Sequence, residues 1–156
     1  MGFTSNETGG GISPWKFDNK TGQLTLNESL SSLPPGWEGA SYAADIKITP
    51  NGRFAYVSNC DGRKLDAGMP HGDTLAAFEI NQKSGNLSVV GHCATHRFPR
   101  SFCIDVTGNF LFAASELENK LDAFRVDQKT GALKHLETGI ASIWVTCWRI
   151  DSAARQ

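Results

Sequence analysis

The segment WKFDNKTGQL at residues 15–24 returns as FEINQKSGNL at residues 78–87 and again as FRVDQKTGAL at residues 124–133. In each copy an apolar strand end leads into Asp or Asn, then Lys, Ser or Thr, and Gly, and an apolar residue opens the next strand. The Asp or Asn side chain starts a turn, and Gly supplies the positive φ at its end. Strand pairs repeated at roughly 45-residue spacing predict the blades of a β-propeller.

A second motif alternates with the first. It reads ADIKITPNGRFAYVSN at residues 44–59 and FCIDVTGNFLFAAS at residues 102–115. Each copy is typical of a strand, a tight turn that ends in Gly, and a second strand. In chain order the two motifs predict two four-stranded units, with strands at 45–49, 54–58, 74–80 and 87–93, and then at 101–106, 110–114, 121–126 and 133–137.

We therefore predict an all-β chain of β-propeller blades, each of four antiparallel strands, arranged in an incomplete ring. An outer strand pair at 12–17 and 24–30 precedes the two full blades, and one inner strand at 143–148 follows them. Because propellers contain about four to eight blades, we expect the chain to be part of a longer ring or a truncated product. A small independent β-sandwich of about eight strands is the alternative that the length allows.

The organisation of the chain follows from the same patterns. The partial propeller is expected over residues 12–150, between a flexible segment at 1–11 and a tail at 151–156. Residues 1–11 show no pattern that would cap the first blade. An open ring leaves apolar blade faces bare, so we expect self-association through residues 12–30 and 143–148.

Composition excludes several classes of protein. The net charge is −1, with 15 basic and 16 acidic residues, so we expect no nucleic-acid surface. No apolar run approaches the roughly 20 residues of a membrane span, and the first residues lack a signal-peptide pattern, so no membrane partner is expected. The four cysteines show no CxxC pair. We interpret them as reduced thiols of a cytoplasmic protein, and we expect no metal site and no cofactor.

Two segments carry a family resemblance. AADIKITPNGRFAYVSN at 43–59 and PRSFCIDVTGNFLFAAS at 99–115, together with the Lys-Thr-Gly-x-Leu turns, resemble the 6-phosphogluconolactonase family of seven-bladed propellers. The resemblance covers residues 15–148 and corresponds to the carboxy-terminal portion of that family. It implies hydrolysis of a sugar lactone, with phosphorylated gluconolactone of the pentose phosphate route as one candidate. A lactonising cyclase of the same superfamily and a non-catalytic propeller fragment that acts as a binding or scaffold module are the alternatives.

The sequence departs from the family at one point. Members commonly carry Ser-Asn-Arg after the second strand of a blade, but here the run is Ser58-Asn59-Cys60. Arg63 follows inside an enlarged loop at residues 61–73. Either Arg63 has taken over the role of the missing arginine, or the site is degraded.

Candidate site residues gather at one end of the predicted sheets, because alternating strands bring the loops after the second and fourth strand of each blade to the same side. Lactone hydrolysis needs a base for water, a donor for the oxyanion and cations for an acidic substrate. The catalytic candidates are Asp45, Arg100, His71 and His96, and the substrate-binding candidates are Arg63, Arg97 and Asn59. Arg100 matches the family Pro-Arg and suits an anion or oxyanion.

The identity of the general base stays open in the sequence. Asp45 begins an inner strand and is a candidate for the base or for a group that orients it, while His71 and His96 are candidates because histidine is the residue type that ordinarily changes charge near neutral pH. Each candidate also has a structural interpretation: Arg100 bonding loop carbonyls, Asp45 capping strand ends, and the histidines lying on surface loops. Arg97 is interpreted as a rim residue.

Overall fold

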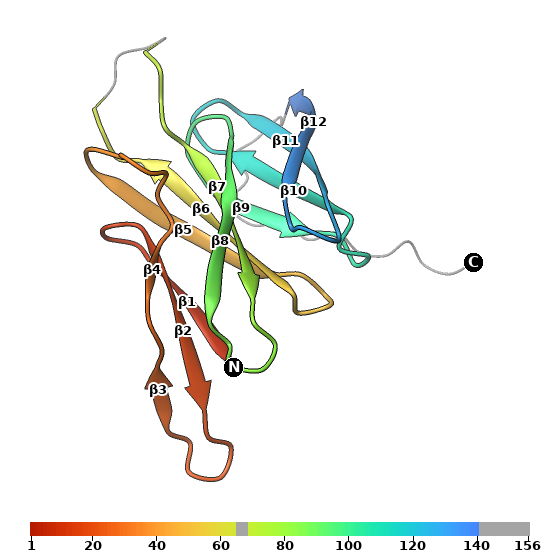
Figure 1. Ribbon diagram of the computed structural model, residues 1–156. Helices are drawn as coiled ribbons and strands as arrows, with labels where there is room; N and C mark the ends of the chain where they lie inside the picture. Colours follow the sequence, from red (N-terminus) through yellow and green to blue (C-terminus); the bar gives the residue numbers. More distant parts are fainter. Residues whose placement is uncertain (65–68, 141–156) are drawn as a thin grey trace.

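The computed structural model describes residues 1–64 and 69–140, which form twelve β-strands in three antiparallel sheets (Figure 1). The first sheet contains β1 (Gly2–Asn6), β2 (Gly11–Phe17), β3 (Leu24–Leu26) and β4 (Leu30–Ser31). The second contains β5 (Ser41–Ile48), β6 (Phe54–Asp61), β7 (Thr74–Ile80) and β8 (Leu87–Ala94). The third contains β9 (Pro99–Ile104), β10 (Phe110–Ser115), β11 (Lys120–Val126) and β12 (Leu133–Ile140).

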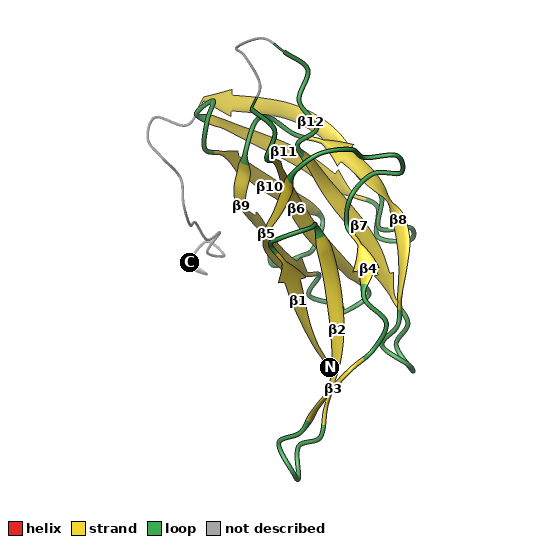
Figure 2. Cartoon of the chain, turned by 90° about the vertical axis from the view of Figure 1, so that its left-hand side faces the viewer, coloured by secondary structure: helices red, strands yellow, loops and turns green. Residues whose placement is uncertain are grey.

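The second and third sheets are simple meanders of four strands, in the orders β5-β6-β7-β8 and β9-β10-β11-β12. This arrangement confirms the predicted propeller blades. Figure 2 shows the three sheets packed against one another, with β5 next to both β1 and β9. The described residues contain no helix long and apolar enough to span a membrane.

The amino-terminal sheet differs from expectation in two places. Residues 1–11 were expected to be flexible and without a strand, but β1 lies there and pairs with β2 along its whole length. The strand expected at 24–30 is split into β3 and β4, which both pair with β2. At the split, the side chain of Asn27 donates to Ser84 O (3.4 Å) and Asn86 Oδ1 (3.3 Å) in the turn between β7 and β8, so the break accompanies contacts with residues distant in the sequence. The inner strand expected at 143–148 lies outside the described residues.

The core consists of two apolar layers, one on each side of β6. Phe54 and Tyr56 pack toward the third sheet with Leu75, Phe102, Leu111 and Phe124. Ala55 and Val57 pack toward the first sheet with Ile12, Ala43, Ala76 and Phe78. Because successive side chains of a strand point to opposite faces, a strand covered on both sides is buried at every position. This is what β6 shows, and it is how each blade of a propeller depends on its neighbours.

Candidate functional site

The site end of the sheets is the end where β5 and β9 begin and where β6 and β10 finish. Ser41 of β5 pairs with Asp61 of β6, and Pro99 of β9 pairs with Ser115 of β10. The loops that follow β6 and β10, and the connection from β8 to β9, therefore lie at this end. The tight turns that follow β5, β7, β9 and β11 lie at the other end.

Arg100 stands in a β-bulge at the start of β9. Ser115 pairs with Pro99 and Ala114 pairs with Ser101, so Arg100 is an extra residue without a partner in the ladder. A bulge redirects the side chain that it contains. The Arg100 side chain is exposed, and no hydrogen bond or ion pair within the described residues engages its guanidinium group. Burial raises the pKa of the Cys60 thiol, and the positive charge of Arg100 partly opposes that rise. Arg100 is therefore available to bind an anion.

Phe98, two residues earlier, has a left-handed backbone with φ of 61°. Such a conformation is uncommon for a residue other than glycine and costs of the order of 1–3 kcal/mol. Three backbone hydrogen bonds hold it. The N–H of Phe98 donates to Asp73 Oδ1 (2.9 Å), and its carbonyl accepts from Arg100 N (2.8 Å) and Glu116 N (2.9 Å). The bulge that carries Arg100 thus begins at a strained residue that a carboxylate supports.

Asp73 is almost fully buried, with 1% of its side chain exposed. Its Oδ1 accepts hydrogen bonds from the backbone N–H groups of Asp61 and Phe98, each at 2.9 Å. Its Oδ2 lies 2.8 Å from His71 Nδ1. Burial raises the pKa of the Asp73 carboxyl, although these hydrogen bonds and the neighbouring imidazole oppose that shift.

The His71 ring touches this carboxylate without an aligned hydrogen bond. Nδ1 is buried and has no well-oriented hydrogen-bond partner in the described part of the chain, so its 2.8 Å contact with Asp73 is an electrostatic one. A quarter of the side chain is exposed. A buried carboxylate beside one ring nitrogen is the usual way to orient a catalytic imidazole, and such contacts are often poorly aligned before substrate binds.

Arg63 does not offer a free charge. Its Nε and Nη2 donate to Asp61 at 2.9 and 2.6 Å, and its guanidinium lies 4.8 Å from the centre of the Trp37 ring. Burial alone would raise the pKa of Asp61, but hydrogen bonds from Arg63 and from the N–H of Gly72 lower it to about 2. Arg63 therefore connects the enlarged loop to Asp61 at the end of β6, and its charge is engaged within the protein.

Asn59 is also taken up by the fold. It is buried, donates to Ser32 O (2.7 Å) and Thr74 Oγ1 (3.2 Å), and accepts from Ser32 Oγ (2.6 Å). All of its hydrogen-bonding groups are used within the protein. The structure thus places this substrate-binding candidate in a link between β6 and the segment after β4.

Asp45 joins two sheets. It lies in a bulge of β5, accepts from Phe102 N (3.2 Å) and Ser101 Oγ (3.4 Å) of β9, and forms an ion pair with Lys47. Counted back from the matching residues Phe54 and Phe110, Asp45 corresponds to Ser101, one residue beyond Arg100. Asp45 and Arg100 therefore do not occupy equivalent positions, and Asp45 bonds the inner strand β5 to the inner strand β9.

His96 belongs to another cluster, around the buried Asp122 of β11. His96 Nδ1 and His135 Nε2 lie 2.8 and 3.1 Å from Asp122 Oδ1, and Thr138 Oγ1 donates to the same oxygen at 2.8 Å. Burial opposes the charge of Asp122, but its hydrogen bonds give it a net lowered pKa. Arg97, next to His96, donates its backbone N–H to Glu118 Oε2 at 2.8 Å and remains a rim residue.

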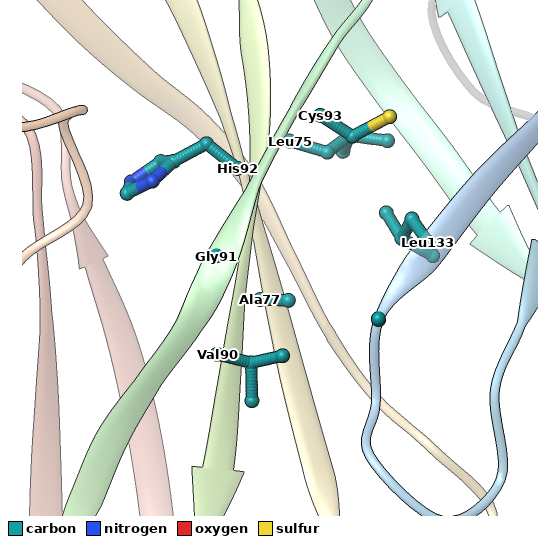
Figure 3. Close-up of a pocket in the computed structure, with 8 residues that line it drawn as sticks. Leu75, Ala77, Val90, Gly91, His92, Cys93 and Leu133 are labelled. Atoms are coloured by element: carbon teal, nitrogen blue, oxygen red, sulfur yellow. The ribbon is translucent and has the colours of Figure 1, made fainter.

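The cavity in Figure 3 lies away from these residues. It has a volume of about 80 Å³ and is lined by apolar side chains of the second and third sheets, among them Leu75, Ala77, Val90 and Leu133. His92 points to the other side of β8, where its Nε2 lies 3.1 Å from Ser32 O. This cavity is a packing gap between blades. Across the described ranges, no group of three or more His, Cys, Asp or Glu is arranged to hold a metal ion.

Two features of this end were not assigned a role from the sequence. Asp73 has a weak signal, since it stands two residues after His71 and directly before a strand. Phe98 has none, because its left-handed conformation arises from hydrogen bonds to residues distant in the sequence. Of the seven predicted site residues, the structure places Arg100 and His71 next to this carboxylate network.

Comparisons with known proteins agree with the fold. The family described as "Lactonase, 7-bladed beta-propeller" matches residues 1–148. A 6-phosphogluconolactonase of Pectobacterium carotovorum is 32% identical over 152 residues, which is 96% of this chain and 43% of the relative. One from Yersinia pestis is 32% identical over 149 residues, 94% of this chain and 42% of the relative. The chain thus spans less than half the length of these curated relatives.

Solved structures show the same arrangement. A protein from Lactobacillus plantarum superposes with a TM-score of 0.78 at 26% identity, over 89% of this chain and 38% of its own. A putative 6-phosphogluconolactonase from Bacteroides fragilis gives 0.73 at 27% identity, over 89% and 36%. The periplasmic gluconolactonase of Pseudomonas aeruginosa gives 0.74 at 23% identity, over 87% and 36%, and supports the fold alone.

Proposed function

The chain belongs to the seven-bladed β-propeller lactonase family, and we propose that it contributes to the active site of a hydrolase that opens sugar lactones. In this reaction water attacks the lactone carbonyl, the ring C–O bond breaks, and a sugar acid is released. The observation that carries the proposal is the exposed guanidinium of Arg100, which no hydrogen bond or ion pair among the described residues engages, in a bulge that Phe98 links to the buried Asp73–His71 pair. The relatives named 6-phosphogluconolactonase support the class of substrate.

In the proposed mechanism Arg100 supplies positive charge. A guanidinium pairs with phosphate or carboxylate through two parallel hydrogen bonds, and it also stabilises an oxyanion as negative charge develops on the carbonyl oxygen. Arg100 stands in a bulge of an inner strand, and the rigid sheet fixes the direction of its side chain. An anion bound to it would therefore have a well-defined position.

His71 is the proposed general base. The imidazole takes a proton from the attacking water, and Asp73 beside Nδ1 stabilises the imidazolium that forms. The proton then passes to the ring oxygen that leaves as a hydroxyl group. Asp45 is left out of this mechanism because its carboxylate accepts from Ser101 and Phe102 and pairs with Lys47. His96 is left out because its Nδ1 faces Asp122 of β11 and not Asp73, the carboxylate that also binds the Phe98 N–H at the Arg100 bulge.

The substrate proposed is a phosphorylated gluconolactone of the pentose phosphate route, in the cytoplasm. Cys60 and Cys93 are free thiols, which suits a reducing compartment. The test is acid release in a pH-stat from gluconolactone with and without the 6-phosphate, measured above the spontaneous rate. Faster turnover of the phosphorylated lactone supports the proposal. Turnover of neither, by protein shown to be folded, refutes it.

A non-catalytic binding module is the second candidate function. It is favoured by Cys60 at the place of the usual family arginine and by the engagement of Arg63 with Asp61. Binding of a phosphorylated sugar acid without turnover of its lactone would support this candidate. Ring closure of a muconate derivative would instead support a lactonising cyclase.

Self-association is proposed for the chain when it is isolated. The hairpin of β2 and β3 projects beyond the other strands in both views and exposes Phe17, Leu24 and Leu26 (Figures 1 and 2). The outer face of the third sheet carries a groove lined in part by Phe110, Ala123 and Leu136. Such apolar faces are expected to find partners. Sedimentation velocity tests this: concentration-dependent oligomers support it, and a monomer at all concentrations refutes it.

A further inference from the structure

One buried carboxylate connects the anion-binding group and the base. Asp73 Oδ1 binds the N–H of Phe98, and the carbonyl of Phe98 binds the N–H of Arg100. Asp73 Oδ2 faces His71. The two oxygens of a single side chain therefore serve two different parts of the proposed site.

We propose that Asp73 is a positioning residue that aims Arg100 at a phosphate or carboxylate of the substrate by holding Phe98 in its left-handed conformation, and that it separately orients His71. The inference rests on the proposed function for His71. Its first half concerns anion binding and stands without any turnover.

The first half depends on backbone strain. Phe98 has φ of 61°, a value that side chains other than Gly, Asn and Asp rarely adopt. Without the Oδ1 acceptor, the Phe98 N–H would lose its bond and the residue would relax toward the extended region. The carbonyl of Phe98 would then turn away from Arg100 N and Glu116 N, and the bulge that directs the Arg100 side chain would be lost.

The second half depends on which atom occupies the Oδ2 position. In Asp73→Asn the remaining oxygen can keep the bonds to Asp61 N and Phe98 N, while an NH2 group faces His71 Nδ1. An amide NH2 only donates, so it selects the tautomer with a lone pair on Nδ1 and a proton on Nε2. That tautomer cannot take a proton through Nε2. Asp73→Asn is therefore expected to preserve anion binding and to lower turnover.

The experiment measures anion binding apart from catalysis, in the intact protein. Inorganic phosphate is titrated while the Arg100 Nε–H signal is followed by NMR. Asp73→Ala is expected to weaken phosphate binding roughly tenfold, the loss typical of one hydrogen bond to a charged group, and Asp73→Asn is expected to leave it unchanged. Asp122→Ala is the matched control: Asp122 has a similarly buried carboxylate beside a histidine, one sheet further on. It is expected to lower stability and leave phosphate binding unchanged.

A second pair of variants keeps Asp73 in place, in case Asp73→Ala does not fold. Phe98→Asn retains a residue that tolerates the left-handed region, whereas Phe98→Val introduces a β-branched residue that does not. Phosphate binding is expected to persist in the first and to weaken in the second. Equal phosphate binding by Phe98→Asn and Phe98→Val overturns the proposal, as does wild-type binding by folded Asp73→Ala, or equal weakening by Asp73→Ala and Asp122→Ala.

The kinetic arm separates the inference from the proposed function. If lactones are turned over, Asp73→Asn should lower kcat with little change in KM, and Asp73→Ala should change both. If Asp73→Asn both lowered kcat and raised KM, Asp73 would not have separate roles toward His71 and Arg100. If no lactone is turned over, the proposed function fails, but the phosphate titration still decides whether Asp73 positions Arg100.

Discussion

The turns at one end of the sheets are copies of one another, whereas the loops at the other end differ from blade to blade. At the first end Asp18, Asn81 and Asp127 occupy one position in three turns. Each accepts hydrogen bonds through Oδ1 from the backbone N–H groups two and three residues later. Each turn ends in a glycine, with φ of 75° at Gly22, 74° at Gly85 and 76° at Gly131.

At the site end the corresponding positions carry unlike chemistry. Asn59 corresponds to Ser115 and Asp73 to Asn119, and the loops between them differ in length. The buried acids Asp61 and Asp73, the strained Phe98 and the exposed Arg100 lie at this end. Repetition thus marks the part that builds the blades, and departure from repetition marks the end where the ligand site is proposed. Four tests with substituted proteins probe this division.

Arg100→Ala should have the largest effect. Loss of one preorganised donor for an oxyanion typically lowers kcat by about 10²–10³-fold, and loss of an anion-binding group adds an increase in KM. Stability should change little, since no hydrogen bond or ion pair within the described residues engages this guanidinium. Initial rates of lactone hydrolysis measure the effect.

The matched control is Lys83→Ala, which removes a positive charge from a copied turn at the far end. It should leave kcat and KM unchanged. The comparison fails if Arg100→Ala retains near-normal turnover, or if Lys83→Ala lowers turnover as much.

Gly131→Ala and Gly22→Ala test whether the same substitution in two copies of the turn lowers the free energy of unfolding by the same amount. Both glycines have positive φ, and alanine there costs about 1–2 kcal/mol in backbone strain. A Cβ on Gly22 meets open space, but one on Gly131 would collide with the buried Phe54 ring, which adds about 1–3 kcal/mol. Urea unfolding should therefore show a larger loss for Gly131→Ala. Equal losses would mean that the third sheet does not pack on Phe54 as described.

Asp61→Asn tests the buried charge at the site end through pH. The pKa of Asp61 is lowered to about 2, so its ionisation stabilises the fold above the ordinary pKa near 4, and this stabilisation is lost as pH falls toward 2. The pH-dependent part amounts to about 2 kcal/mol. The free energy of unfolding of wild type should exceed that of Asp61→Asn at pH 6, and this difference should become smaller at pH 2.5. A difference that does not depend on pH would contradict the role of the Arg63 pair.

The blades could be predicted because their information is local. The turn motif and the alternating strands recur in the same order, and the described strands of the second and third sheets lie where the motifs predict them to within about four residues. Strand β1 escaped prediction because its sequence, GFTSN, has no strong alternation and its order comes from pairing with β2. The break between β3 and β4 likewise depends on bonds from Asn27 to another sheet.

The site was only partly predictable, for a related reason. Strand order predicts which loops share an end, and the Pro-Arg pair marks the start of an inner strand, so Arg100 could be chosen. Whether a polar side chain is free is decided by tertiary contacts, and sequence could not show that Asn59 bonds Ser32 or that Arg63 bonds Asp61. Counting back from Phe54 and Phe110 aligns Asp45 with Ser101 in the sequence, but that the Asp45 carboxylate bonds Ser101 and Phe102 of the next sheet is decided by tertiary contacts.

Asn81→Asp should have the smallest effect, because it gives the second copy of the turn the aspartate that the first and third copies have at the same position. A carboxylate oxygen can accept the same hydrogen bonds from Lys83 N and Ser84 N, each now at 3.0 Å, as Asp18 and Asp127 accept in their turns. Stability should change by less than about 0.5 kcal/mol, as for most surface substitutions, and lactone turnover should not change. The reverse replacement of a carboxylate by an amide at the other end, Asp73→Asn, should impair turnover. If Asn81→Asp destabilises the protein by much more, or if both exchanges are silent, the two ends do not differ as their loops indicate.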